Sequence, residues 1–223
     1  MKNKKILIFI AVILTIAIGV FVYYKISNSK YLFKAYLEEH NGNYTLVIKN
    51  KDYFSFNEMW KIEDAQMDNG HIKVLPWVLD NRANKITKVD IQDNIKIRSI
   101  SFWFYNLNNL KEIVGLEKID TSELVSMSAT FKNCSSLEEI DLSSFNTKNV
   151  TTTSGMFSGC NNLKTIYVGN NWNMDKVESS DDMFKDCTSL IGPNATEYNE
   201  YVVDKTFAQV DDLDNAGYLT LKN

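Results

Sequence analysis

The chain has 223 residues, is 44% hydrophobic and carries a formal net charge of −4 at pH 7. Its first 30 residues hold five lysines and no acids, which leaves 19 basic and 28 acidic residues and a net charge of −9 for the remainder. This acidic balance argues against nucleic acid as a partner, because surfaces that bind phosphate are basic. Roughly 190 residues suffice for one well-buried domain.

An uncharged, largely apolar segment spans residues 6–24. Its nineteen residues would form a helix of roughly 28 Å, close to the hydrocarbon thickness of a bilayer. We therefore predict a transmembrane signal-anchor at 1–26 and a linker at 27–34. The small residues Ala17 and Gly19 leave a cleaved signal peptide as the alternative. The expected localisation is single-pass in the cell membrane, with a cytoplasmic N-terminus and an extracellular C-terminal domain.

Residues 35–80 are predicted to form an N-terminal β cap. The segment 44–48 has the β-branched and aromatic content typical of a strand. The two histidines of the chain, His40 and His71, lie in this region, and no Cys-x-x-Cys or nucleophile motif accompanies them. Neither a zinc site nor a Ser/His/Asp triad is therefore predicted.

A repeat of 26–27 residues fills the predicted repeat domain, residues 81–192. Its clearest copies are Phe131-Lys-Asn-Cys134-Ser-Ser-Leu137, Phe157-Ser-Gly-Cys160-Asn-Asn-Leu163 and Phe184-Lys-Asp-Cys187-Thr-Ser-Leu190. An earlier copy, beginning at Phe104, has Leu107 in place of the cysteine. A fixed period of this length is typical of stacked repeat architectures.

Each repeat is predicted to contain one helix and one strand. Val150, Phe157 and Cys160 are spaced so that they share one stripe of a helix. Residues 165–168 alternate polar and apolar side chains, which is typical of a strand with one buried face, and residues 86–91 follow the same pattern.

The predicted fold class is α/β, a short leucine-rich-repeat-type solenoid of helices and strands with a parallel sheet. One repeat cannot bury its apolar face alone, so four or five must stack. The N-terminal β cap would close one end. Residues 193–223, where the period is lost, would form the C-terminal cap.

The outward positions of the predicted strands are the candidate partner-binding face, because side chains alternate between the two faces of a sheet. These positions are Lys88, Asp90, Glu112, Glu139, Asp141, Thr165 and Tyr167. They are mixed in charge and mildly acidic, with Tyr167 as the candidate aromatic anchor. The expected partner is a protein.

The three cysteines share one repeat position: Cys134, Cys160 and Cys187. Since Leu107 fills the same position, we interpret them as a structural column of free thiols. A disulfide between adjacent repeats is the alternative, because stacked Cα atoms would lie about 5 Å apart.

Two acidic clusters offer oxygen ligands for Ca²⁺, with a solvated face as the competing interpretation. Their members are Asp181, Asp182 and Asp186, and Asp211, Asp212 and Asp214. No metal, cofactor or catalytic residue is predicted.

The repeat phrase resembles a known family. Met156-Phe157-Ser-Gly-Cys160 and Leu142-Ser-Ser-Phe145-Asn-Thr147-Lys-Asn-Val150-Thr151 are similar to the repeat of BspA-like leucine-rich-repeat bacterial surface proteins. The similarity covers residues 35–223. It implies exposure at the cell surface and, as in some members, binding of host or matrix proteins or of other cells.

The predicted function is therefore a membrane-anchored surface protein whose repeat domain mediates protein–protein interaction without catalysis, including adhesion to host or matrix proteins. The alternative is a structural or envelope-associated accessory protein that binds partners of its own cell.

Overall fold

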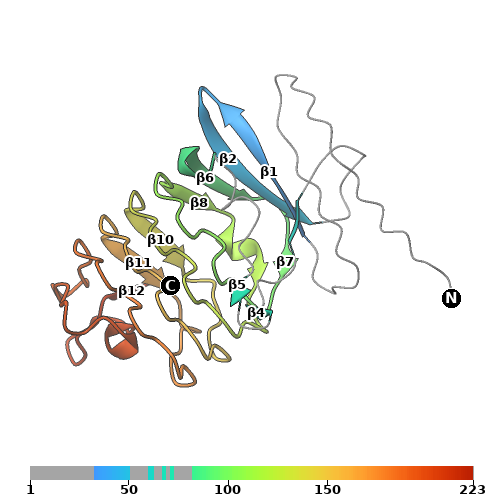
Figure 1. The fold of residues 1–223 in the computed structure, drawn as a ribbon. Helices are drawn as coiled ribbons and strands as arrows, with labels where there is room; N and C mark the ends of the chain where they lie inside the picture. Colours follow the sequence, from blue (N-terminus) through green and yellow to red (C-terminus); the bar gives the residue numbers. More distant parts are fainter. Residues whose placement is uncertain (1–32, 51–59, 63–66, 69–70, 73–81, 223) are drawn as a thin grey trace, which may run out of the picture.

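The computed structural model describes residues 33–50, 60–62, 67–68, 71–72 and 82–222, and Figure 1 shows the strands following one another from the blue hairpin to the orange-red C-terminal segment. The hairpin consists of β1 (Phe33–His40) and β2 (Asn43–Asn50), which pair antiparallel. Its turn residues Asn41 and Gly42 have φ of 53° and 82°, as a two-residue type I′ turn requires.

The hairpin belongs to a five-stranded sheet with the order β3-β1-β2-β6-β8. The other members are β3 (Trp60–Ile62), β6 (Ile86–Ile91) and β8 (Glu112–Val114). β6 coincides with the strand predicted at 86–91 and pairs parallel with both β2 and β8. The hairpin thus joins directly to the strands of the repeat domain. The predicted anchor, residues 27–32 of the predicted linker and part of the predicted N-terminal cap lie outside the described residues, whereas Phe33 and Lys34 of the linker are the first residues of β1.

A second sheet has the order β10-β11-β12 and is parallel throughout. It contains β10 (Glu139–Leu142), β11 (Thr165–Val168) and β12 (Leu219–Leu221). Two small pairs complete the strands: β4 (Met67–Asp68) with β5 (His71–Ile72), and β7 (Ile95–Lys96) with β9 (Ile119–Asp120). Short 3-10 turns are η2 (Ala83–Lys85), η3 (Leu116–Lys118) and η4 (Lys205–Phe207).

The predicted fold class is wrong, because the described residues contain strands, loops and 3-10 turns but no α-helix. The segments predicted as helices are successive turns. In one of them Ala129 and Asn133 have φ of 51° and 63°, and left-handed residues end a right-handed helix. The sheets are small, and the protein is not a leucine-rich-repeat-type solenoid of helices and strands.

Hydrogen bonds between neighbouring repeats replace those of a helix. In the second repeat the N–H groups of Ala129, Phe131 and Asn133 donate to carbonyls of the third repeat, at N–O distances of 2.9, 2.9 and 2.7 Å. The equivalent turns of the repeats on either side follow the same rule, so in these turns each repeat donates to the one after it. At the last repeat the N–H of Phe184 donates instead to the Val203 carbonyl, at 2.8 Å. The C-terminal segment therefore closes this end of the stack.

A column of aromatic rings forms the centre of the stack. Neighbouring rings of Phe104, Phe131, Phe157 and Phe184 are stacked with centroids 5.5, 5.4 and 5.7 Å apart. Tyr218 meets the last ring edge-on, at 5.2 Å. All five side chains are fully buried.

The predicted localisation is corrected as well. In the ranges that the structure describes, no helix is both long and apolar enough to cross a bilayer. The segment 6–24, on which that prediction was based, lies outside these ranges.

Candidate functional site

The predicted partner-binding face is divided between the two sheets. In the first sheet, Lys88 stands beside Glu112, and Asp90 beside Val114. In the second, Glu139 stands beside Thr165, and Asp141 beside Tyr167. β8 and β10 are not paired in either sheet. The seven predicted residues therefore lie as two groups in two separate sheets.

The charged side chains of the first group already have partners in the chain. Lys88 Nζ lies 2.8 Å from a carboxylate oxygen of Glu112. The Gln92 amide donates a hydrogen bond of 2.7 Å to Asp90. A partner that used these groups would first have to break these contacts.

The second group, on the outer face of the β10–β11–β12 sheet, contains an ammonium group, Lys222, that is absent from the predicted face. Lys222 Nζ lies 2.6 Å from Asp141 Oδ2 and 5.2 Å from the centre of the Tyr167 ring. Both charged side chains are about half exposed. The alternation in 219–221 is the sequence signal for β12, which carries Lys222 to this face just after the strand ends.

Charge and hydrogen bonding fix the protonation states here. Partial burial raises the pKa of Asp141, but hydrogen bonds from Lys222 and Ser143 outweigh it, and the pKa is lowered overall. The hydrogen bond to Asp141 raises the pKa of Lys222. The pair is therefore ionised at neutral pH.

The inner face of this sheet packs into the hydrophobic core. Ile140, Leu142, Ile166 and Val168 alternate with the outward residues and are buried. The backbone that carries the outward side chains is therefore fixed by the core. Glu139 and Asp141 are exposed, whereas Thr165 and Tyr167 are partly buried.

The three cysteines are free and buried in one column. Each thiol donates to the phenylalanine carbonyl of the preceding repeat: Cys134 to Phe104, Cys160 to Phe131 and Cys187 to Phe157, at 3.0, 3.0 and 3.1 Å. Burial raises the pKa of Cys160 to about 12 and raises the other two well above their usual value. Thiols held in the protonated form are poor nucleophiles and poor metal ligands.

The second acidic cluster uses its carboxylates within the chain. Asp211 is 3% exposed and accepts hydrogen bonds of 2.6 Å from both the Thr196 hydroxyl and the Asn194 N–H. Burial raises the pKa of Asp211, but these hydrogen bonds lower it below its usual value. In the part of the chain that the structure covers, no group of three or more His, Cys, Asp or Glu residues is arranged to hold a metal ion.

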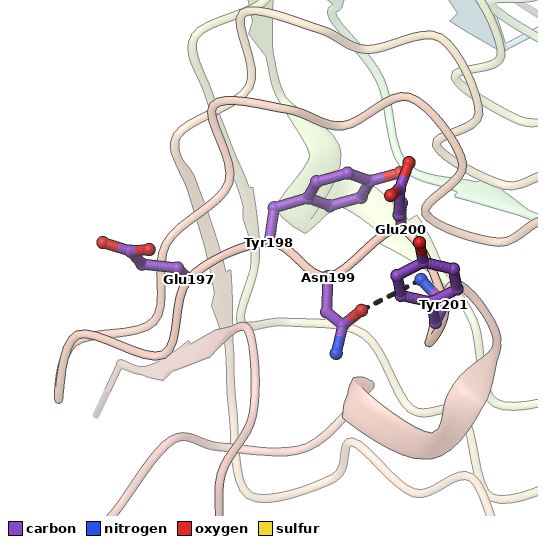
Figure 2. Close-up of a pocket in the computed structure, with 5 residues that line it drawn as sticks. All are labelled: Glu197, Tyr198, Asn199, Glu200 and Tyr201. Atoms are coloured by element: carbon purple, nitrogen blue, oxygen red, sulfur yellow. Dashed lines mark hydrogen bonds between the residues drawn. The ribbon is translucent and has the colours of Figure 1, made fainter.

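A surface pocket lies on the C-terminal segment (Figure 2). It is lined by five consecutive residues, 197–201, and Tyr201 is 87% exposed. Asn199 Oδ1 accepts a hydrogen bond of 2.9 Å from the Tyr201 N–H, as the dashed line shows. Because one loop supplies the whole lining, the pocket does not bring together groups from different elements.

These features define a class: a repeat protein with stacked turns, a buried aromatic column and an exposed parallel sheet. Residues 77–200 match a family described as Mycoplasma protein of unknown function, DUF285, and the chain belongs to this family. Comparisons with curated proteins and with solved structures gave no significant match. The resemblance to BspA-like proteins stays a prediction.

Proposed function

We propose that this protein is a non-catalytic protein-interaction module that binds a partner with the outer face of the β10–β11–β12 sheet. The observation that carries the proposal is the register of four outward side chains on a fixed backbone: Glu139, Asp141, Thr165 and Tyr167. They combine charge, a hydroxyl and an aromatic ring within two neighbouring strands. Tyrosine is enriched among the residues that dominate interfaces, because it adds contact area at little cost in side-chain entropy.

The size of this face limits the partner contact. Neighbouring strands are about 4.8 Å apart, so a three-stranded sheet presents a surface only about 10 Å across. An interface confined to it is smaller than the usual 800 Å² or so per partner. We therefore expect a short segment of the partner to bind, with weak to moderate affinity.

The test is affinity capture from cell extracts by the full chain, followed by mass spectrometry. The face variant Glu139→Gln/Asp141→Asn/Tyr167→Leu is compared with a matched control, Glu178→Gln/Asp181→Asn/Tyr201→Leu, which alters exposed residues outside this face. A protein that binds the sheet should be captured by the control variant but not by the face variant. If both variants capture the same proteins as the wild type, the proposal is wrong. Extracts of the source cell and of host tissue separate the accessory role from host binding.

A further inference from the structure

The outer face of the β10–β11–β12 sheet already holds an ammonium group. Lys222 Nζ is bound by the Asp141 carboxylate at 2.6 Å and lies over the Tyr167 ring at 5.2 Å. A carboxylate next to an aromatic face is a favourable environment for lysine and arginine side chains. The chain thus shows which chemistry this face accepts.

A second carboxylate extends the same site. Glu139 and Asp141 are two residues apart on β10 and both are exposed. Residues two apart on a strand point to the same side and are about 6.8 Å from each other along it. An extended segment with two cationic side chains at alternate positions has the same spacing, so it can place one ammonium group at each carboxylate.

Lys222 would compete with such a segment. Its ammonium occupies the Asp141–Tyr167 position, while its backbone N–H is held independently by the Val168 carbonyl at 2.8 Å. The side chain is half exposed and can leave the site without loss of this backbone contact. Displacement therefore costs only one exposed ion pair and its contact with the ring.

We propose that the outer face of the β10–β11–β12 sheet recognises an extended protein segment with lysine or arginine at alternate positions, and that Lys222 occupies one of the two cation positions until the partner displaces it. This inference rests on the proposed function and names the chemistry of the partner. The partner is a basic strand-like segment, because the two carboxylates lie along one strand.

Two peptides of identical composition test the spacing. Acetyl-Thr-Lys-Thr-Lys-Thr-amide has alternate lysines, and acetyl-Thr-Thr-Lys-Lys-Thr-amide has adjacent ones; each carries a fluorescent label for anisotropy with the full chain. We expect Lys222→Gln to bind the alternating peptide about two- to fivefold more tightly than the wild type does, the worth of one exposed ion pair. Lys222→Gln should also bind the alternating peptide more tightly than the peptide with adjacent lysines, by a similar factor. Asp141→Asn/Tyr167→Leu should abolish the preference.

The control is Lys185→Gln, which removes a lysine from another exposed pair, with Asp182 at 3.6 Å, and changes the net charge equally. It should leave the affinity for the alternating peptide near the wild-type value. Equal binding of the two isomers to Lys222→Gln, or equal gains from Lys222→Gln and Lys185→Gln, would overturn the inference. If captured partners depend on the sheet while the isomers bind equally, only this inference fails. If capture is independent of the sheet, the proposed function fails as well.

Discussion

The stack of repeats and the C-terminal segment 193–222 are stabilised in different ways. In the stack, the same three contacts recur in successive repeats. The phenylalanine rings stack on each other, each cysteine thiol donates to a carbonyl of the preceding repeat, and turn N–H groups donate to carbonyls of the next repeat. In the C-terminal segment each contact occurs once, and side chains make most of them. Asp211 binds the 194–196 turn, and the Tyr198 hydroxyl accepts from the Asp186 N–H at 3.0 Å. A repeating backbone ladder needs a neighbour of the same shape, so the end of the stack depends on individual side chains.

The largest effect is expected in the centre of the aromatic column. Phe157 stacks between Phe131 and Phe184 and is fully buried, so Phe157→Ala should cost about 3–5 kcal/mol of unfolding free energy through lost burial and a cavity. Chemical denaturation measures this loss. Tyr201→Ala is the control, because an 87% exposed ring should change stability by less than about 0.5 kcal/mol. Similar losses for the two variants would show that the column does not dominate stability.

A smaller loss of unfolding free energy is expected when Asp211, which holds the C-terminal segment through its hydrogen bonds, is replaced. Asp211→Asn replaces a buried carboxylate that accepts several hydrogen bonds and should cost about 2–3 kcal/mol. The folded pKa of Asp211 lies below its unfolded value of about 3.9, so its contribution is present above that pH and is lost as the pH falls through the folded pKa. The difference in unfolding free energy between wild type and variant should therefore shrink from about pH 7 to about pH 3. A constant difference would mean that the charge of Asp211 does not matter.

The smallest effect concerns one hydroxyl inside the stack. Thr153 Oγ1 is buried and has no hydrogen-bond partner among the residues that the structure describes. Thr153→Val should stabilise the protein by about 1 kcal/mol, because it removes an unsatisfied polar atom and keeps the shape. Thr130→Val is the matched test of opposite sign, since the Thr130 hydroxyl donates to the Met127 carbonyl at 2.7 Å. Thermal unfolding of both variants is the measurement, and destabilisation by both would contradict the assignment.

The strands of the repeats could be predicted from the sequence, but the helices could not. Alternating polar and apolar residues located β6, β10 and β11 because this period is specific to a strand with one buried face. The spacing of Val150, Phe157 and Cys160 indicated a helix, although a series of turns buries the same positions. The relevant signal was the column Asn106, Asn133, Gly159 and Asp186, which is left-handed in every repeat. Asparagine, aspartate and glycine are the residues that tolerate this conformation.

The outward residues of the candidate site were predictable, but their charge partner was not. Glu139, Asp141, Thr165 and Tyr167 follow from the alternation of β10 and β11. Lys222 reaches them because β12 pairs with β11. The paired residues are about 50 positions apart in the sequence, and β12 lies in the segment where the repeat period is lost. A pairing of that kind depends on how the C-terminal segment folds back over the stack, and no local pattern specifies it.

In the turns that precede each cysteine position, the backbone hydrogen bonds between repeats run one way and give the stack a direction. In these turns every interior repeat accepts from the repeat before it and donates to the repeat after it. Other bonds between the same repeats run the opposite way, such as those from the Thr151 N–H to the Val125 carbonyl and from the Lys164 N–H to the Glu138 carbonyl. Because both sets recur, any interior repeat has the same interface requirements as its neighbours. A duplicated unit of 26–27 residues could therefore be added within the stack without altering the hairpin at one end or the Val203 contact at the other. Growth of such a protein would lengthen its sheet while leaving both of its ends unchanged.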